Sequence, residues 1–211
     1  MLINEIFRSI QGETSFAGLP FVFVRLTGCN LRCSYCDTQY AYDEGNEMPI
    51  SSIIDKIDSF GLKSVCVTGG EPLSNHNTPV LVRELLNRNY TVLVETNGSY
   101  DVSVLPEGTI RILDVKCPDS GMSHKMCWHN ISHLTKKDEV KFVLSSRNDY
   151  EWARSMISKY HLTEIAHILM NPVYGMIQPS LIASWILEDH INVRLQLQMH
   201  KYIWGPETRG V

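Results

Sequence analysis

Short apolar segments alternate with amphipathic segments along most of the chain. The run Pro20–Gly28 (PFVFVRLTG) is rich in β-branched and aromatic residues and ends at a glycine, which is typical of a buried strand. Met48–Gly61 instead places its isoleucines at helical spacing, with Ser51 or Ser52 available as the N-cap and Gly61 to end the helix. The chain therefore begins with a predicted strand followed by a predicted helix.

The same alternation continues toward the C-terminus. Further strands are predicted in Ser64–Pro72, Tyr90–Gly98, Thr109–Pro118, Glu139–Ser146, Ala166–Gly175 and Asn192–Ile203, and helices in Thr78–Asn89, Asn148–Tyr160 and Pro179–His190. Repeated strand–helix units indicate a parallel sheet. About six parallel strands are too few to close an eight-stranded barrel, so we expect an open, partial β/α barrel. One domain over residues 1–211 is expected, with an irregular segment near 117–138.

Polar or glycine-rich clusters stand at the end of one predicted strand after another. They read GCNLRC, TGGEP, ETNG, DVK, NPVYG and QMHK in chain order. In β/α folds the carboxyl ends of the strands meet at one edge of the sheet, where sites are built. We therefore expect these clusters to converge on a single site.

Composition and charge narrow the classes of partner. The 211 residues are 44% hydrophobic and 20% charged, with a net charge of −4, which gives no bulk attraction for nucleic acid or an anionic membrane. Glu5 and Arg8 interrupt the opening where a signal peptide would be apolar, and no apolar run approaches the ~20 residues of a membrane span. The expected location is the cytoplasm, where the six cysteines stay reduced.

Three of those cysteines form one short loop with the spacing C-x3-C-x2-C. Cys29, Cys33 and Cys36 follow a predicted strand, and three thiolates on a loop suit an iron–sulfur cluster or zinc. A four-iron cluster with three cysteine ligands keeps one iron free for a small-molecule ligand. A structural zinc site needs a fourth protein ligand, which would come from a histidine or from a distant cysteine, Cys66, Cys117 or Cys127. Both metals remain open on spacing alone.

Outside that loop the cysteines and histidines have simpler interpretations. Cys66 lies mid-strand and is expected in the core, and neither Cys117 nor Cys127 has the spacing of a cluster ligand. His124, His129 and His133 recur at intervals of four to five residues, and a solvent-facing segment is favoured over a zinc site there.

Several motifs together resemble a known enzyme family. They are IFRSIQGETSFAGLPFVFVRLTGCNLRCSYCDT (Ile6 to Thr38), VTGGEP, VETNGS and QMHKYIWG, and they resemble the 7-carboxy-7-deazaguanine synthases of the radical S-adenosylmethionine (SAM) superfamily. The resemblance implies a partial β/α barrel with the cluster loop after the first strand, and a [4Fe–4S] cluster, SAM and Mg²⁺ as cofactors. It implies a lyase that converts 6-carboxy-5,6,7,8-tetrahydropterin to 7-carboxy-7-deazaguanine with loss of ammonia, in queuosine or deazapurine biosynthesis.

Two other functions remain as alternatives. Activating enzymes that generate a glycyl radical on a partner protein share part of the opening pattern but lack the QGE and HKY stretches in this arrangement. A non-catalytic, zinc-stabilised binding module is the alternative from another class. The family resemblance also implies a small pterin substrate, an electron donor such as a flavodoxin or ferredoxin, and a homodimer, with no nucleic-acid or membrane partner.

The resemblance assigns the cofactor residues by position. Cys29, Cys33 and Cys36 would bind the cluster, and the hydroxyl of Thr38 would bind Mg²⁺ beside Asp37. Chemistry in such enzymes starts from a SAM-derived 5′-deoxyadenosyl radical, so no catalytic side chain is assigned. The expected SAM-binding residues lie at the strand ends: Tyr35, Gly70, Glu95, Asn97, Asp114, Val115, Lys116, Asn171, Pro172, Val173 and Tyr174.

Substrate-binding residues are expected from the chemistry of a carboxylated pterin. The stretch Ile10, Gln11, Gly12 and Glu13 offers backbone, amide and carboxylate groups for the aminopyrimidine edge. Arg25 suits the substrate carboxylate, because guanidinium–carboxylate pairs are bidentate. The resemblance adds Thr68 and His200 as substrate contacts, and the terminal carboxylate of Val211 is the last member of the expected set.

Overall fold

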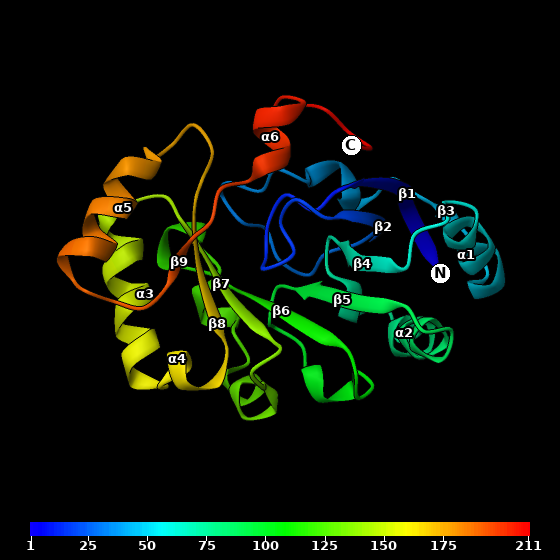
Figure 1. Cartoon of the computed structure of the whole chain (residues 1–211), viewed down its shortest axis with the longest axis horizontal. Helices are drawn as coiled ribbons and strands as arrows, with labels where there is room; N and C mark the ends of the chain where they lie inside the picture. Colours follow the sequence, from blue (N-terminus) through cyan, green and yellow to red (C-terminus); the bar gives the residue numbers. More distant parts are fainter.

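The computed structural model describes all residues, 1–211, and its strands form one nine-stranded sheet in the order β3-β1-β2-β4-β5-β6-β7-β8-β9 (Figure 1). The strands are β1 (Leu2–Ile10), β2 (Pro20–Leu26), β3 (Asn46–Glu47), β4 (Ser64–Gly69), β5 (Thr91–Thr96), β6 (Ile110–Val115), β7 (Glu139–Leu144), β8 (His167–Pro172) and β9 (Arg194–Leu195). Strand β2 and strands β4 to β9 pair in parallel, whereas β1 is antiparallel to both β2 and β3. The two outermost strands do not pair with each other, so the sheet is the expected open, partial barrel.

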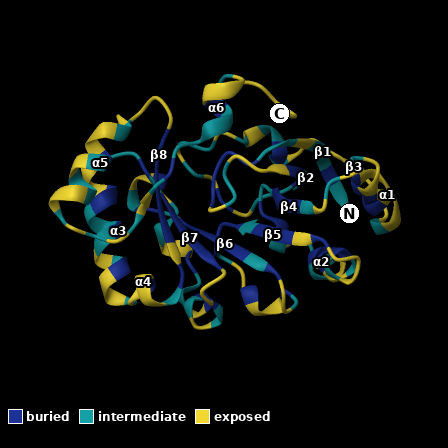
Figure 2. Ribbon diagram, in the orientation of Figure 1, coloured by how far each residue is buried: buried dark blue, intermediate teal, exposed yellow.

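Five of the six helices cover the outer side of this curved sheet. The six helices are α1 (Ile50–Asp58), α2 (Thr78–Asn87), α3 (Arg147–Lys159), α4 (Leu162–Ile165), α5 (Pro179–Glu188) and α6 (Met199–Ile203). Figure 1 shows α1 to α5 around the rim and α6 above the open side. Isoleucines and leucines on the inner helix faces pack against valines of the strands in one large core, and Figure 2 shows the exposed residues concentrated on the outside.

The irregular segment expected near 117–138 contains only 3-10 helices, at Pro118–Ser120, Ser123–Lys125 and Trp128–His133. Further 3-10 turns lie at Gln39–Tyr42, Pro72–Ser74 and Val102–Val104. None of the helices combines the length and hydrophobicity that crossing a bilayer requires.

Several elements differ from the sequence prediction: the short strand β3 and the short helix α4 were not predicted, and two longer segments differ as well. Strand β1 was not predicted, because its residues run in alternating apolar and polar pairs (LINEIFRSI), which matches neither a buried nor a half-buried strand. The predicted closing strand Asn192–Ile203 is wrong: only two residues pair as β9, and Met199–Ile203 forms α6 instead. The reason is that polar side chains of this segment have partners on the open side of the sheet, described below.

The loop between β1 and β2 fills the end of the barrel at which the parallel strands begin. Phe16 packs edge-on against Phe21 with ring centroids 5.7 Å apart, next to a small buried cluster that includes Cys66, which lies in the core as predicted. The Ser15 amide donates to the buried Glu139 carboxylate at 2.9 Å. The loop thereby closes the end of the barrel away from the strand carboxyl ends and leaves the other end open.

Candidate active site

A cavity of about 300 Å³ lies at the carboxyl ends of the parallel strands. It gathers side chains from eight parts of the chain, so the polar clusters at the strand ends converge as the sequence indicates. The residues named from the sequence that line it are Ile10, Gln11, Gly12, Glu13, Arg25, Cys29, Cys33, Tyr35, Cys36, Asp37, Thr38, Thr68, Gly70, Glu95, Asn97, Asp114, Lys116, Val173, Tyr174, His200 and Val211.

Three residues named from the sequence do not line this cavity. The Val115 side chain is packed in the hydrophobic core. Pro172 borders a second, smaller cavity beside Tyr174. Asn171 lies behind the site, where its amide donates to the Glu13 carboxylate at 3.2 Å and its own Oδ1 is buried with no hydrogen-bond partner.

The cysteine loop begins where β2 ends. Gly28 has a left-handed backbone (φ 99°), which turns the chain out of the strand so that all three thiols face the cavity. The amide of Asn97 donates to the Cys29 sulfur at 3.8 Å, and burial raises the pKa of the thiols of Cys29 and Cys33. No three cysteine, histidine or acidic side chains are placed to hold a single metal ion. In a cubane cluster each cysteine binds a different iron, so the thiols fit that group better than zinc.

The glycine turn after β4 packs directly against the start of the cysteine loop. A Cβ atom at Gly70 would lie 2.2 Å from the Gly28 carbonyl oxygen and 2.8 Å from the Cys29 Cβ, so only glycine fits there. The Glu71 amide donates to that same carbonyl at 2.8 Å. The buried Glu71 carboxylate accepts from the backbone N–H of Asn97 at 2.6 Å and the Thr96 hydroxyl at 2.8 Å, and burial raises its pKa to about 7. These contacts fix the carboxyl ends of β2, β4 and β5 relative to one another.

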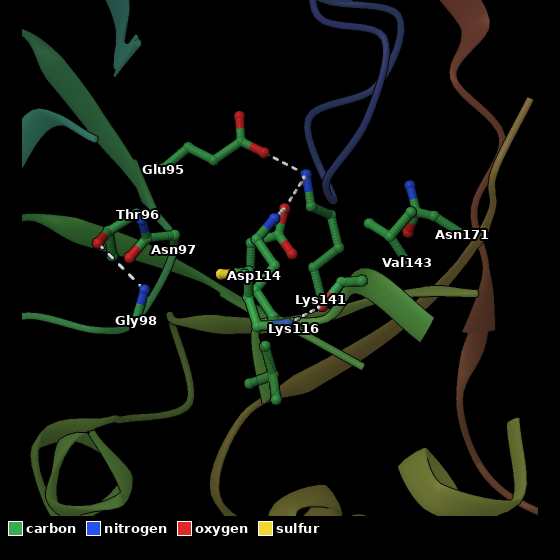
Figure 3. A network of polar contacts seen from close by, with 12 residues as sticks. Glu95, Thr96, Asn97, Gly98, Asp114, Lys116, Lys141, Val143 and Asn171 are labelled. Carbon is green, nitrogen blue, oxygen red and sulfur yellow. Dashed lines mark hydrogen bonds and ion pairs between the residues drawn. The ribbon is translucent and has the colours of Figure 1, made fainter. Parts of the chain in front are cut away.

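A buried lysine joins the carboxylates of the cavity. Figure 3 shows Lys141 of β7 reaching toward Glu95 and Asp114. Its ammonium lies 2.9 Å from Glu13 Oε2 and 3.3 Å from Asp114 Oδ2, and it also pairs with Glu95. Lys116 adds a second cation, 3.0 Å from Asp114 Oδ2. Three carboxylates thus share two ammonium groups.

The charges of this network stabilise one another against burial. Burial alone opposes ionisation of Glu13, but the Lys141 ammonium outweighs it and lowers the pKa of that carboxyl group. Burial likewise opposes the charge of Lys141, yet Glu13 and its other carboxylate neighbours raise the lysine pKa well above its usual range. Both groups are therefore charged at neutral pH.

The C-terminal segment closes the open side of the cavity. Gln198 donates to Glu13 Oε1 at 2.8 Å, and the Lys201 ammonium lies 2.6 Å from Asp37 Oδ2. His200 packs so closely on Gly12 that a Cβ there would lie 2.3 Å from its Nδ1, and burial lowers the histidine pKa. Residues at the two ends of the chain therefore form one wall of the site.

Arg25 has a partner from the neighbouring strand. Its Nε donates to Glu5 Oε1 at 2.7 Å, whereas its two terminal nitrogens make no hydrogen bond. The Tyr40 hydroxyl donates to the same Glu5 oxygen at 3.1 Å. The guanidinium is held in place and still presents two donors to the cavity.

Three cavity residues that contact its carboxylates Glu13, Asp37, Glu95 or Asp114 were missed by the sequence reading. They are Lys141, Gln198 and Lys201. Lys141 carried a usable signal, because it is a lone cation within the apolar run EVKFVLSS and is opposite Asp114 in the sheet register. Gln198 and Lys201 had no such signal, since they were assigned to a strand.

Comparisons with known proteins agree on a family. Residues 23–114 match the model of the radical SAM superfamily. The chain is 40% identical to the 7-carboxy-7-deazaguanine synthase of Koribacter versatilis, with all of both chains covered. It is 43% identical to the synthase of Chlorobaculum tepidum, over 99% of this chain and 96% of the relative. The crystal structure of QueE from Escherichia coli superposes with a TM-score of 0.77 at 21% identity, covering 94% of each chain.

Proposed function

The chain belongs to the 7-carboxy-7-deazaguanine synthase family, and on that premise we propose that it converts 6-carboxy-5,6,7,8-tetrahydropterin to 7-carboxy-7-deazaguanine with loss of ammonia. The pathway is that of queuosine and related deazapurines. The product differs from the substrate by one ammonia, so the ring contraction needs no net oxidant or reductant. The observation that carries the proposal is one cavity lined by the three-cysteine loop, the glycine turn and a guanidinium with two free donors.

A [4Fe–4S] cluster and SAM are the cofactors of this family. Cys29, Cys33 and Cys36 would hold the cluster, and the Asn97 amide would donate to its Cys29 sulfur. When bound, these groups supply one-electron chemistry that removes a hydrogen atom from an unactivated carbon. The narrow turn at Gly70 keeps the backbone next to the cluster loop free of side chains, as close approach by SAM requires.

The protein itself would orient the substrate. Arg25 offers two parallel donors to the substrate carboxylate, which is the favoured geometry of such pairs. The Glu13 carboxylate has about four acceptor sites and already accepts from Lys141, Asn171 and Gln198. One site therefore remains for an N–H group of the pterin. Thr68, His200 and Val211 line the rest of this region.

We extend the proposal to Mg²⁺ at Thr38. Its hydroxyl donates to Asp37 Oδ1 at 2.8 Å, which leaves the oxygen lone pairs free for a hard cation. With one protein oxygen, the cation would complete its shell from substrate and water. It would thereby fix the substrate carboxylate.

The proposed electron donor and the proposed homodimer follow from which side chains are exposed. The three cluster cysteines are each partly exposed, so an external donor of the flavodoxin or ferredoxin class can approach the cluster. Tyr202, Ile203 and Trp204 are large exposed residues beside one another, which supports a homodimer. All six cysteines are free, which supports the expected cytoplasmic location.

The decisive experiment is turnover of the pterin by anaerobically purified, reconstituted protein. With SAM, Mg²⁺ and a reductant, we expect 7-carboxy-7-deazaguanine and ammonia in equal amounts, measured by liquid chromatography with mass spectrometry. Cys33→Ala should lose both iron and product, whereas Cys127→Ala, a partly exposed cysteine outside the loop, should keep both. A protein that cleaves SAM but leaves the pterin unchanged would contradict the substrate assignment. A protein that binds one zinc and no iron would contradict the whole proposal.

A further inference from the structure

Two phenylalanine rings form an aromatic patch in the wall of the cavity. Phe7 of β1 and Phe23 of β2 are opposite each other in the sheet register, and both line the cavity. Their rings stack with centroids 5.2 Å apart and an interplanar angle of 11°. Both side chains are only partly buried, so the patch presents aromatic surface to the cavity rather than filling the core.

The packing behind Phe23 fixes its ring. Phe23 packs on the small buried cluster that includes Phe21 and Cys66, and its ring centroid lies 6.4 Å from that of Phe21. Phe7 is not among the residues packed on either buried cluster of the core, so its ring belongs to the cavity wall. The patch is therefore a rigid surface with the core on one side and the cavity on the other.

The patch lies between the groups assigned to the two ends of the substrate. Phe23 precedes Arg25 by two residues on β2, so both side chains leave the same face of the sheet. Phe7 lies three residues before the end of β1, after which the chain forms the Gln11–Glu13 stretch. The inner face of β1 and β2 thus presents, in order, a donor for the carboxylate, an aromatic pair, and polar groups for the aminopyrimidine edge.

A pterin has a chemical feature that matches this order. Its pyrimidinone half is planar and conjugated, with hydrogen-bonding groups on its edges and none on its faces. Arg25 and Glu13 are suited to the edges and leave the faces without a partner. An aromatic side chain is a favourable partner for such a face, because stacking tolerates polar groups at the rim of the ring and removes apolar surface from water.

We propose that Phe23, stacked on Phe7, binds the planar half of the pterin through its ring and thereby selects a flat ring system. Arg25 fixes one end of the substrate and Glu13 the other. Phe23 then distinguishes a conjugated bicyclic carboxylate from carboxylates that have no planar ring. This assignment rests on the proposed pterin substrate and adds to it the group that recognises the face of the ring.

The first test is the kinetics of Phe23→Leu in the reconstituted holoenzyme. Leucine keeps an apolar side chain and removes the aromatic face. Stacking of a base on one aromatic ring contributes roughly 5- to 150-fold to binding, so the KM for the pterin should rise within that range. The iron content and the KM for SAM should stay at the native values, and kcat should change less than KM. An unchanged KM for the pterin would overturn the proposal.

Phe21→Leu is the matched control. Phe21 lies on the same strand and the same face, two residues before Phe23, but it is fully buried and lies outside the cavity. Its replacement should lower the thermal unfolding midpoint at least as much as Phe23→Leu does, because it removes core volume. The KM for the pterin should not change. An equal rise in KM in both variants would overturn the proposal, since it would reflect a general loosening of the barrel.

A second readout does not depend on turnover. Equilibrium dialysis of 6-carboxypterin, a flat and fully conjugated analogue, against the holoenzyme with SAM measures binding directly through the fluorescence of the free pterin. Phe23→Leu should bind it roughly 5- to 150-fold more weakly than the native chain or Phe21→Leu. Equal binding would overturn the role of Phe23 even if the native chain turns over its substrate. If the native chain leaves carboxytetrahydropterin unchanged while the difference in binding persists, the reaction assignment fails and the role of Phe23 stands.

Discussion

Replacing Lys141 by methionine tests the buried charge network most directly. The lysine side chain is only 5% exposed and contacts three carboxylates, whereas methionine has similar length and no charge. Lys116 stays near Asp114 in the variant, but Glu13 keeps only neutral donors, Asn171 and Gln198. The substitution therefore leaves a buried carboxylate without its counter-ion.

The loss of stability follows from that unpaired charge. Removing one partner of a buried ion pair costs about 3–5 kcal/mol, far more than the pair itself is worth. For a chain of this size each kcal/mol shifts the unfolding midpoint by about 2–4 °C, so a decrease of roughly 6–20 °C is expected. Lys159→Met is the matched control, since that lysine is exposed on α3, and it should change the midpoint little.

The pH dependence has a definite sign. In the native chain the pKa of Glu13 is lowered, so its contribution to stability is present above the pKa of the unfolded chain and is lost as pH falls. Without Lys141, burial of Glu13 is unopposed and raises that pKa, so the variant gains stability as pH falls. The difference between the two proteins should therefore shrink from pH 7.5 to pH 5.

Anaerobic thermal unfolding of the cluster-loaded proteins at several pH values measures this difference. Adding Glu13→Gln to Lys141→Met should recover part of the lost stability, because the unpaired charge is then gone. A Lys141→Met variant as stable as the native chain, or a difference that grows on acidification, would refute the account of the network.

Three further substitutions test separate parts of the site. Arg25→Ala should keep its iron and raise the pterin KM by roughly 10–100-fold, the range for a lost charged hydrogen bond of about 1.5–3 kcal/mol; loss of iron would instead give Arg25 a structural role. Gly70→Ala should abolish SAM cleavage, because its Cβ meets backbone 2.2 Å away. Gly18→Ala is its control: the backbone there is left-handed, so alanine is strained, but the added Cβ has no atom within 4 Å. This variant should be less stable and should keep SAM cleavage. Thr38→Val should weaken the dependence of turnover on Mg²⁺, and an unchanged Mg²⁺ titration counts against the proposed ligand.

The inner strands were predictable because burial on both faces produces continuous apolar runs. Val22 and Val24 of β2, and Val65 and Val67 of β4, are fully buried, and their sequences read as strands without any other information. Strand β1 is antiparallel and near the edge of the sheet, so half of its side chains meet water or the cavity. Its apolar and polar residues come in pairs (LINEIFRSI), which matches neither the continuous apolar run of a buried strand nor the strict alternation of a half-buried one.

The site residues that could be named from the sequence are those whose position follows from being next to a strand end. Cys29 and Gly70 lie in such turns, and their neighbours in space are set by the parallel register Leu26 to Gly69. Lys141 lies inside a strand instead, and its partners come from three other segments. Its lone positive charge in the run EVKFVL marks it as unusual, but its partners depend on which face of β7 points inward, which the run does not specify because nearly all of it is buried.

Helix α6 could not be predicted because its conformation is not local. A helix of five residues is not stable by itself in water. The bonds that fix it come from the other end of the chain: the Met199 amide donates to the Gly12 carbonyl at 2.9 Å, and Gln198 and Lys201 contact Glu13 and Asp37. The β1–β2 loop and the C-terminal segment are thus one structural unit split across the sequence. Because the loop carries residues assigned to the substrate and Asp37 follows the last cluster cysteine, α6 links the substrate side of the cavity to the cluster side.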